Sequence, residues 1–120
     1  MFPHLVKGGR GDLNEEFQMK KLFNPSTVAV IGATEREGSV GRTVLENLLR
    51  YPDRIIFPVN PNRKEVIGLE CFPSVLGIPV TVDLAVIVTP ANTVPAMVEE
   101  CGKAGIEWVI IISAGFREAG

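Results

Sequence analysis

The chain has 120 residues, of which 46% are hydrophobic and 22% are charged, and its net charge at pH 7 is −2. This length predicts one domain at most, with enough apolar side chains for a core. The nearly neutral charge argues against a broad basic surface for nucleic acid. No apolar run approaches the roughly 20 residues of a membrane span, and no signal-peptide core follows Met1, so we expect a cytoplasmic protein.

The cysteine and histidine content is low. Cys71 and Cys101 have no C-x-x-C spacing and no neighbouring histidine, so we expect reduced packing residues rather than a disulfide or a metal site. The single histidine, His4, falls in a glycine-rich leader, outside the patterned part of the chain.

Hydrophobic patterns and turn signals predict alternating helices and strands after a flexible leader over residues 1–11. Asp12 and Glu15 form a capping-box pattern ahead of the first helix. In chain order, we expect a helix over 17–22, a strand over 28–31, a helix over 40–50, a strand over 54–59, an extended excursion over 66–72, a helical turn over 73–76, a strand over 84–88, a helix over 93–103 and a strand over 108–112.

The four predicted strands are apolar throughout, as strands covered on both faces are. Their alternation with helices predicts an α/β fold with a doubly wound parallel sheet. In such sheets ligands bind beyond the carboxyl ends of the strands, at the switch point. Four loops rich in Gly, Pro, Ser, Thr or Asn are expected at that edge, over residues 32–39, 60–64, 89–92 and 113–116.

A glycine-rich loop follows the first of these strands. Residues 27–41 read TVAVIGATEREGSVG, in which an apolar strand ends at Gly32 and a helical pattern begins at Val40. Strand, glycine turn and helix start together bring backbone N–H groups and a helix N-terminus against a phosphate. The spacing of Gly32, Gly38 and Gly41 is G-x5-G-x2-G rather than G-x-G-x-x-G, so the ligand need not be NAD.

The end of the second strand indicates which nucleotide is bound. A dinucleotide enzyme needs an acidic residue there for the ribose hydroxyls, but this chain has Asn60. Arg63 and Lys64 follow it, and two cations near an adenosine ribose suit a ribose phosphate. NADP and coenzyme A both carry one, and the spacing alone leaves both open.

Four ordered blocks carry a family resemblance. They are LFNPSTVAVIGATEREGSVGRTVLENLL, IIFPVNPNRKEVIGLECFPSV, VDLAVIVTPANTVPAMVEECGKAG and IIISAGFREAG, and the match covers about residues 21–120. This part of the chain resembles the N-terminal CoA-binding domain of the NDP-forming acyl-CoA synthetases. The ADP-forming acetate–CoA ligases are the nearest members, and the succinyl-CoA synthetase α subunit is more distant. The resemblance implies a Rossmann-like domain over residues 12–120 that binds CoA or an acyl-CoA.

The resemblance also implies which residues meet CoA. The glycine loop takes the phosphates, the second strand end flanks adenosine, a cation meets the ribose phosphate, the third strand end lines the path to pantetheine, and the last turn lies near the thiol. In that order, the implied residues are Gly32, Ala33, Thr34, Gly38, Ser39, Val40 and Gly41; Val59, Asn60 and Pro61; Arg63 or Lys64; Val88, Thr89 and Pro90; and Ser113, Ala114 and Gly115.

Charge and nucleophile assignments follow from simple energetics. A helix N-terminus contributes only about 0.3–2 kcal/mol toward an anion, so at least one cation must assist it. Arg36, Arg42, Arg63 and Lys64 are candidates. For Arg36 and Arg42 a solvated surface charge is the preferred interpretation. Ser113 has no base placed to activate it, so no catalytic residue is predicted.

Family members continue past the equivalent of Gly120, into a further strand, a ligase domain with a phosphorylated histidine and an ATP-grasp domain. We therefore expect a sheet truncated at its C-terminus, in a fragment that lacks the catalytic histidine. The leading hypothesis is a synthetase module that positions the CoA thiol to attack an acyl phosphate held by other domains or subunits. The alternatives are a free-standing, non-catalytic CoA-binding regulator and the remnant of an NADP-binding reductase.

Overall fold

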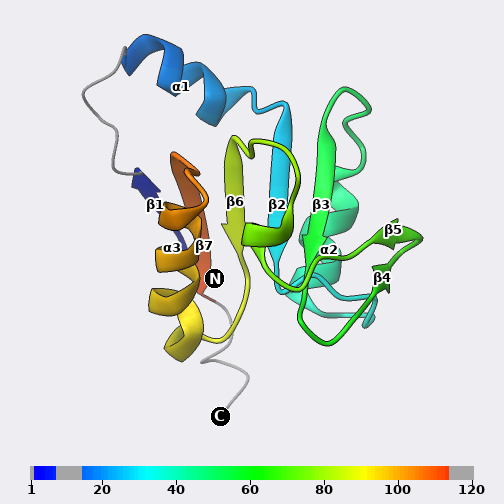
Figure 1. Ribbon diagram of the computed structural model, residues 1–120. Coiled ribbons are helices and arrows are strands. Elements are labelled where there is room, and N and C mark those ends of the chain that lie inside the picture. Colours follow the sequence, from blue (N-terminus) through cyan, green and yellow to red (C-terminus); the bar gives the residue numbers. More distant parts are fainter. Residues whose placement is uncertain (1, 8–14, 114–120) are drawn as a thin grey trace.

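The computed structural model describes the backbone of residues 2–7 and 15–113 and the side chains of residues 19–112 (Figure 1). Strands alternate with helices, as the sequence predicts. The elements are β1 (Phe2–Lys7), α1 (Glu15–Phe23), β2 (Thr27–Ile31), α2 (Val40–Leu48), β3 (Ile55–Val59), β4 (Glu65–Val66), β5 (Leu69–Glu70), the 3₁₀ turn η1 (Val75–Gly77), β6 (Leu84–Ile87), the 3₁₀ turn η2 (Ala91–Thr93), α3 (Val94–Lys103) and β7 (Trp108–Ser113).

Five of these strands form one sheet in the order β1-β7-β6-β2-β3. β7, β6, β2 and β3 run parallel to one another, and β4 and β5 form a separate antiparallel pair. α2 and α3 cover opposite faces of the sheet (Figure 1). This arrangement confirms the predicted Rossmann-like, doubly wound sheet, in which the chain winds outward from β2 in one direction and from β6 in the other.

The two faces of the sheet have separate cores. Val28 and Val30 of β2 face the α2 side, where they pack with Leu45 and Val86. Ala29 and Ile31 alternate with them and face the α3 side, together with Ile87 and Cys101. Because side chains alternate along a strand, burial of both faces requires strands that are apolar throughout.

The N-terminal segment differs from the expected flexible leader. Residues 2–7 form β1, which pairs antiparallel with β7 from Phe2↔Ser113 to Lys7↔Trp108. Without this partner, β7 would present unpaired N–H and C=O groups along the sheet edge. Met1 and residues 8–11 of the expected leader lie outside the described residues, as does Asp12 of the capping box.

The helix boundaries follow from local chemistry. Ser39 caps α2, because its Oγ accepts a hydrogen bond from the Arg42 N–H at 3.2 Å. Gly105, with φ of +79°, follows the end of α3 and lets the chain turn toward β7. Within the part of the chain that the structure describes, no helix has the length and apolar character to cross a bilayer.

Candidate functional site

The switch point of the sheet lies between β2 and β6. The chain leaves β2 toward α2 and leaves β6 toward α3, so the two following loops diverge over opposite faces (Figure 1). The loop after β2, residues 32–39, is called the glycine loop here. It lies beside the loop after β6, since a Cβ on Gly32 would stand 3.0 Å from Val88 and 3.1 Å from Thr89. A crevice for a ligand is expected at this position in a doubly wound sheet.

Two glycines make the close approach of the loop and α2 possible. A Cβ on Gly41 would stand 2.4 Å from the carbonyl oxygen of Gly32, a distance that real Cβ atoms do not reach. Gly32 itself has φ of +99°, and a Cβ there would meet Val88 at 3.0 Å. Glycine is therefore required at both positions. Gly38 also has a positive φ, of +78°, although a Cβ there would meet nothing within 4 Å.

Hydrogen bonds within the loop fix its backbone. The Arg36 N–H donates to Thr34 Oγ1 at 3.1 Å, and Ser39 Oγ donates to the Arg36 carbonyl at 2.6 Å. Since Ser39 also caps α2, the loop and the helix start form one connected unit. These hydrogen bonds hold the loop in one conformation, which reduces the entropic cost of binding a ligand there.

The turn after β3 is tied to the glycine loop by Asn60. Its Nδ2 donates to the Ala33 carbonyl at 2.9 Å, and its Oδ1 accepts the Asn62 N–H at 2.9 Å. The Gly32 N–H also donates to the Val59 carbonyl at 2.9 Å. The residue that replaces the expected acid of a dinucleotide site thus holds two loops together.

Arg42 and Glu35 add a second tie. Arg42 Nη1 donates to the Glu35 carbonyl at 2.7 Å, while its Nε donates to Glu46 at 3.2 Å. The Glu35 carboxylate accepts the N–H of Ile67, in the turn between β4 and β5, at 2.6 Å. Arg42 is therefore not the solvated surface charge that we expected. It fastens the loop, and its guanidinium is occupied by these partners.

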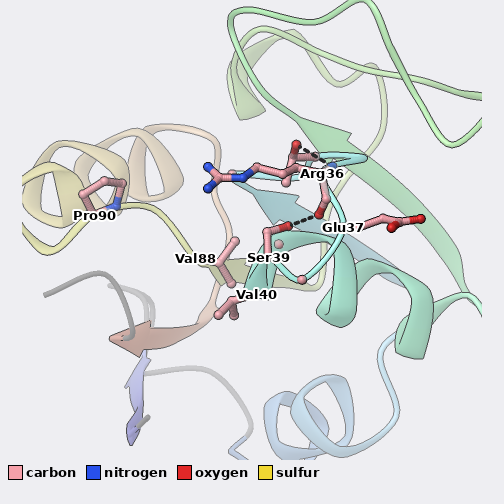
Figure 2. A pocket seen from close by; sticks show the side chains of 10 residues that line it. Arg36, Glu37, Ser39, Val40, Val88 and Pro90 are labelled. Carbon is pink, nitrogen blue, oxygen red and sulfur yellow. Dashed lines mark hydrogen bonds between the residues drawn. The ribbon is translucent and has the colours of Figure 1, made fainter. Parts of the chain in front are cut away.

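One cavity, of about 360 Å³, opens over the glycine loop and is called the glycine-loop cavity. It is bounded by the loop, the start of α2 and the end of β6. Figure 2 shows the Arg36 side chain extending across it, on the side of Val88 and Pro90. The lining residues are Gly32, Thr34, Arg36, Glu37, Gly38, Ser39, Val40, Gly41, Val88 and Pro90.

A larger cavity, of about 550 Å³, lies on the α3 side of the same strand ends and is called the strand-end cavity. It shares Gly32, Val88 and Pro90 with the glycine-loop cavity, so the two cavities adjoin. Its other lining residues are Ile31, Val59, Asn60, Pro61, Asn62, Pro73, Val75, Thr89, Thr93, Met97 and Glu100. Glu100 accepts a hydrogen bond from Ser74 Oγ at 2.7 Å, which orients its carboxylate.

The structure brings most of the sequence-predicted residues to these two cavities. Of those it describes, Ala33 is buried beneath the loop, and Arg63 and Lys64 are exposed beyond the Asn60 turn, outside both linings. Ser113 ends β7 at the same edge of the sheet, while Ala114 and Gly115 lie outside the described residues. Sequence reasoning set aside Arg36 as a surface charge, because nothing in the spacing indicates where its side chain points.

The two cysteines are buried on opposite sides of the sheet. Burial raises the pKa of the Cys101 thiol to about 12, and the neighbouring Glu100 adds to the rise. Burial also raises the pKa of the Cys71 thiol, against a smaller opposing effect from the positive charge of Arg63. Both are neutral thiols at pH 7, in agreement with a packing role.

Comparison with known proteins identifies relatives of this chain. The family model described as CoA binding domain matches residues 26–119. Acetate–CoA ligase (ADP-forming) I from Archaeoglobus fulgidus is 52% identical over 102 residues, which cover 85% of this chain and 15% of the ligase. The chain thus spans a small part of the length of such relatives.

Solved structures with the same fold include a long and a short chain. The apo form of dinucleotide forming acetyl-coenzyme A synthetase 1 from Ca. Korarchaeum cryptofilum matches with a TM-score of 0.77 and 41% identity, over 85% of this chain and 22% of the synthetase. A conserved hypothetical protein from Pyrococcus furiosus matches with a TM-score of 0.62 and 34% identity, over 67% of this chain and 68% of its own.

Proposed function

The chain belongs to the CoA binding domain family, and from this premise we propose that it binds coenzyme A, or an acyl-CoA, across its two adjoining cavities. The phosphates lie against the glycine loop and the adenosine enters the strand-end cavity between Pro61 and Pro90. Arg63 or Lys64, beyond the Asn60 turn, meets the ribose phosphate. The pantetheine arm leaves past Val88 and Thr89 toward Ser113 at the end of β7, which Ala114 and Gly115 follow in the sequence.

A single observation carries this proposal: Gly41 approaches the Gly32 carbonyl so closely that no side chain fits, directly beside a cavity at the switch point. That arrangement exposes backbone N–H groups and the start of α2 to an anion. The first turn of α2 contains no acidic residue that would repel a phosphate.

We further propose that the chain is the CoA-positioning part of an ADP-forming acyl-CoA synthetase. The matched segment covers only 15% of the Archaeoglobus fulgidus ligase and 22% of the Korarchaeum synthetase, so this chain corresponds to a small part of each. The reaction would be attack of the CoA thiol on an acyl phosphate held by other domains or subunits, and residues 12–120 would contribute orientation. A CoA-binding protein without catalysis is the second candidate, because a relative of similar size occurs in Pyrococcus furiosus.

The test is a thermal-shift series with CoA, acetyl-CoA, NADP and NAD at matched ionic strength. A ligand at one hundred times its dissociation constant stabilises the folded chain by about 2.7 kcal/mol, which gives a clear rise in Tm. We expect CoA and acetyl-CoA to raise the Tm and NAD to leave it unchanged. A rise with NADP and none with CoA would contradict the proposal and support the reductase alternative.

The gene separates the synthetase module from the free-standing protein. An open reading frame that continues beyond codon 120 into a histidine-bearing ligase domain supports the synthetase. A stop codon at that point, with CoA binding intact, supports the non-catalytic protein.

A further inference from the structure

We propose that Arg36 supplies the positive charge that binds the diphosphate of CoA in the glycine-loop cavity. This inference rests on the proposed function, since it assigns a residue to part of the same ligand. It concerns a side chain that the sequence analysis named as a candidate cation but interpreted as a solvated surface charge.

A cation is needed because loop amides and one helix N-terminus are weak ligands for a diphosphate. The helix end contributes only about 0.3–2 kcal/mol, whereas hydrogen bonds between ionised partners are roughly twice as strong as neutral ones. Within the described residues, Arg36 is the one cationic side chain in the lining of either cavity at the switch point. Arg63 and Lys64 lie outside both linings.

The guanidinium of Arg36 is available for this role. Two hydrogen bonds hold the backbone of Arg36: its N–H donates to Thr34 Oγ1, and its carbonyl accepts from Ser39 Oγ. They fix the position from which the side chain extends. Among the described residues, its side chain has no hydrogen-bond or ion-pair partner, in contrast to Arg42. Figure 2 shows Arg36 reaching over the cavity while Glu37 extends to the other side. An arginine fork suits two neighbouring phosphate oxygens.

A carboxylate in the strand-end cavity indicates which phosphate group of CoA Arg36 contacts. Glu100 lines that cavity, and its carboxylate is held by Ser74. A fixed negative charge favours N–H or O–H donors of the nucleoside there and opposes a phosphate. The glycine-loop cavity also has a carboxylate in its lining, but Glu37 extends away from Arg36 (Figure 2) and lies 3.9 Å from Arg42 Nη1. The diphosphate, which must lie within reach of the loop amides, therefore occupies that cavity beside Arg36.

Isothermal titration of two ligands tests the assignment. CoA and dephospho-CoA share the diphosphate, but only CoA carries the 3′-phosphate. We expect Arg36→Gln to weaken both ligands by the same factor, about tenfold to a hundredfold, because one charged hydrogen-bonding partner is lost. Arg36→Lys should restore part of the affinity for both. The matched control is Arg50→Gln, which removes the same charge from an exposed position beyond the other end of α2.

The outcomes separate the two proposals. Loss of affinity for CoA alone would move Arg36 to the 3′-phosphate and overturn the inference. If Arg36→Gln binds both ligands as tightly as Arg50→Gln does, the inference is overturned as well. In that case, binding of CoA by the wild-type chain still supports the proposed function. Failure of the wild-type chain to bind either ligand contradicts the proposed function and this inference with it. The Tm of the ligand-free Arg36→Gln variant should match wild type, since no described contact is removed.

Discussion

At the scale of single residues, two helical glycines meet opposite surroundings. Gly41 of α2 faces the Gly32 carbonyl, whereas a Cβ on Gly102 of α3 would meet nothing within 4 Å. We expect Gly41→Ala to lower the free energy of unfolding by about 1–3 kcal/mol, because backbone atoms must shift to admit the methyl group. Urea denaturation measures this change, and CoA affinity should fall with it.

Gly102→Ala is the matched control, with the same substitution in the same type of element. It should raise the unfolding free energy by about 0.5–1 kcal/mol, because alanine is the better helix residue. A Gly41→Ala variant as stable as wild type would show that the approach to Gly32 does not constrain the loop.

Asn60 illustrates how one side chain determines the form of the site. Asn60→Asp removes the donor to the Ala33 carbonyl and places a negative charge against that oxygen. We expect CoA affinity to fall about tenfold or more, and no NAD site to appear, although the acid now stands where dinucleotide enzymes have one. Titration with CoA and NAD measures both effects.

Asn47→Asp is the control, because it adds the same charge at an exposed position of α2 that lines neither cavity. If both variants bind CoA equally well, the bond from Asn60 to the glycine loop is not needed for binding.

At the scale of elements, the sequence predicts most of the fold for identifiable reasons. β2, β6 and β7 lie within the sheet, so both of their faces are apolar and the runs stand out. α2 has an apolar stripe and a serine cap, so its start at Val40 can be predicted from the sequence. β1 escaped prediction because its pairing with β7 joins chain segments more than 100 residues apart.

The candidate site was predictable in its backbone but not in its charges. The glycine spacing identifies the loop, since only glycine permits the approach of Gly41 to Gly32. The different tasks of Arg36 and Arg42 depend on side-chain direction, which the loop conformation sets. The tie from Glu35 to Ile67 likewise spans 32 residues and has no sequence signal.

The burial of Cys101 in α3 gives a prediction for high pH. Its thiol has a pKa of about 12 in the folded chain against 9.0 as the ordinary value. The unfolded chain therefore loses this proton first, so stability present below pH 9 is lost as pH rises toward 12. The expected decrease approaches 1.4 kcal/mol per pH unit, roughly, for one thiol.

Urea denaturation of wild type and Cys101→Ala between pH 8 and pH 12 checks the thiol assignment. The variant should show a shallower decrease in unfolding free energy above pH 9, whatever constant offset the lost sulfur causes. Parallel curves would mean that Cys101 ionises equally in the folded and unfolded chains.

At the scale of the whole molecule, the two edges of the parallel sheet are covered by different pairing partners. Beyond β3, the Phe72 N–H donates to the Pro58 carbonyl and the Asn60 N–H to the Phe72 carbonyl, so a short bridge covers that edge. At the other edge β1 pairs along β7 (Figure 1). Both devices satisfy backbone groups that would otherwise invite a further strand.

Replacing residues 2–7 by a Gly/Ser segment of equal length should therefore change the stability and self-association of the chain much more than its affinity for CoA. We expect the unfolding free energy to fall by about 1–3 kcal/mol and association to rise with protein concentration, because β7 becomes an open edge. Urea denaturation and light scattering measure these changes. Most of the CoA affinity should remain where the chain is folded, because β7 and β6 separate β1 from the glycine loop after β2, and only Phe2, opposite Ser113, lies beside the proposed thiol end. A monomeric variant of unchanged stability would show that β1 does not protect the edge, and a loss of CoA affinity would show that the edge and the site are coupled.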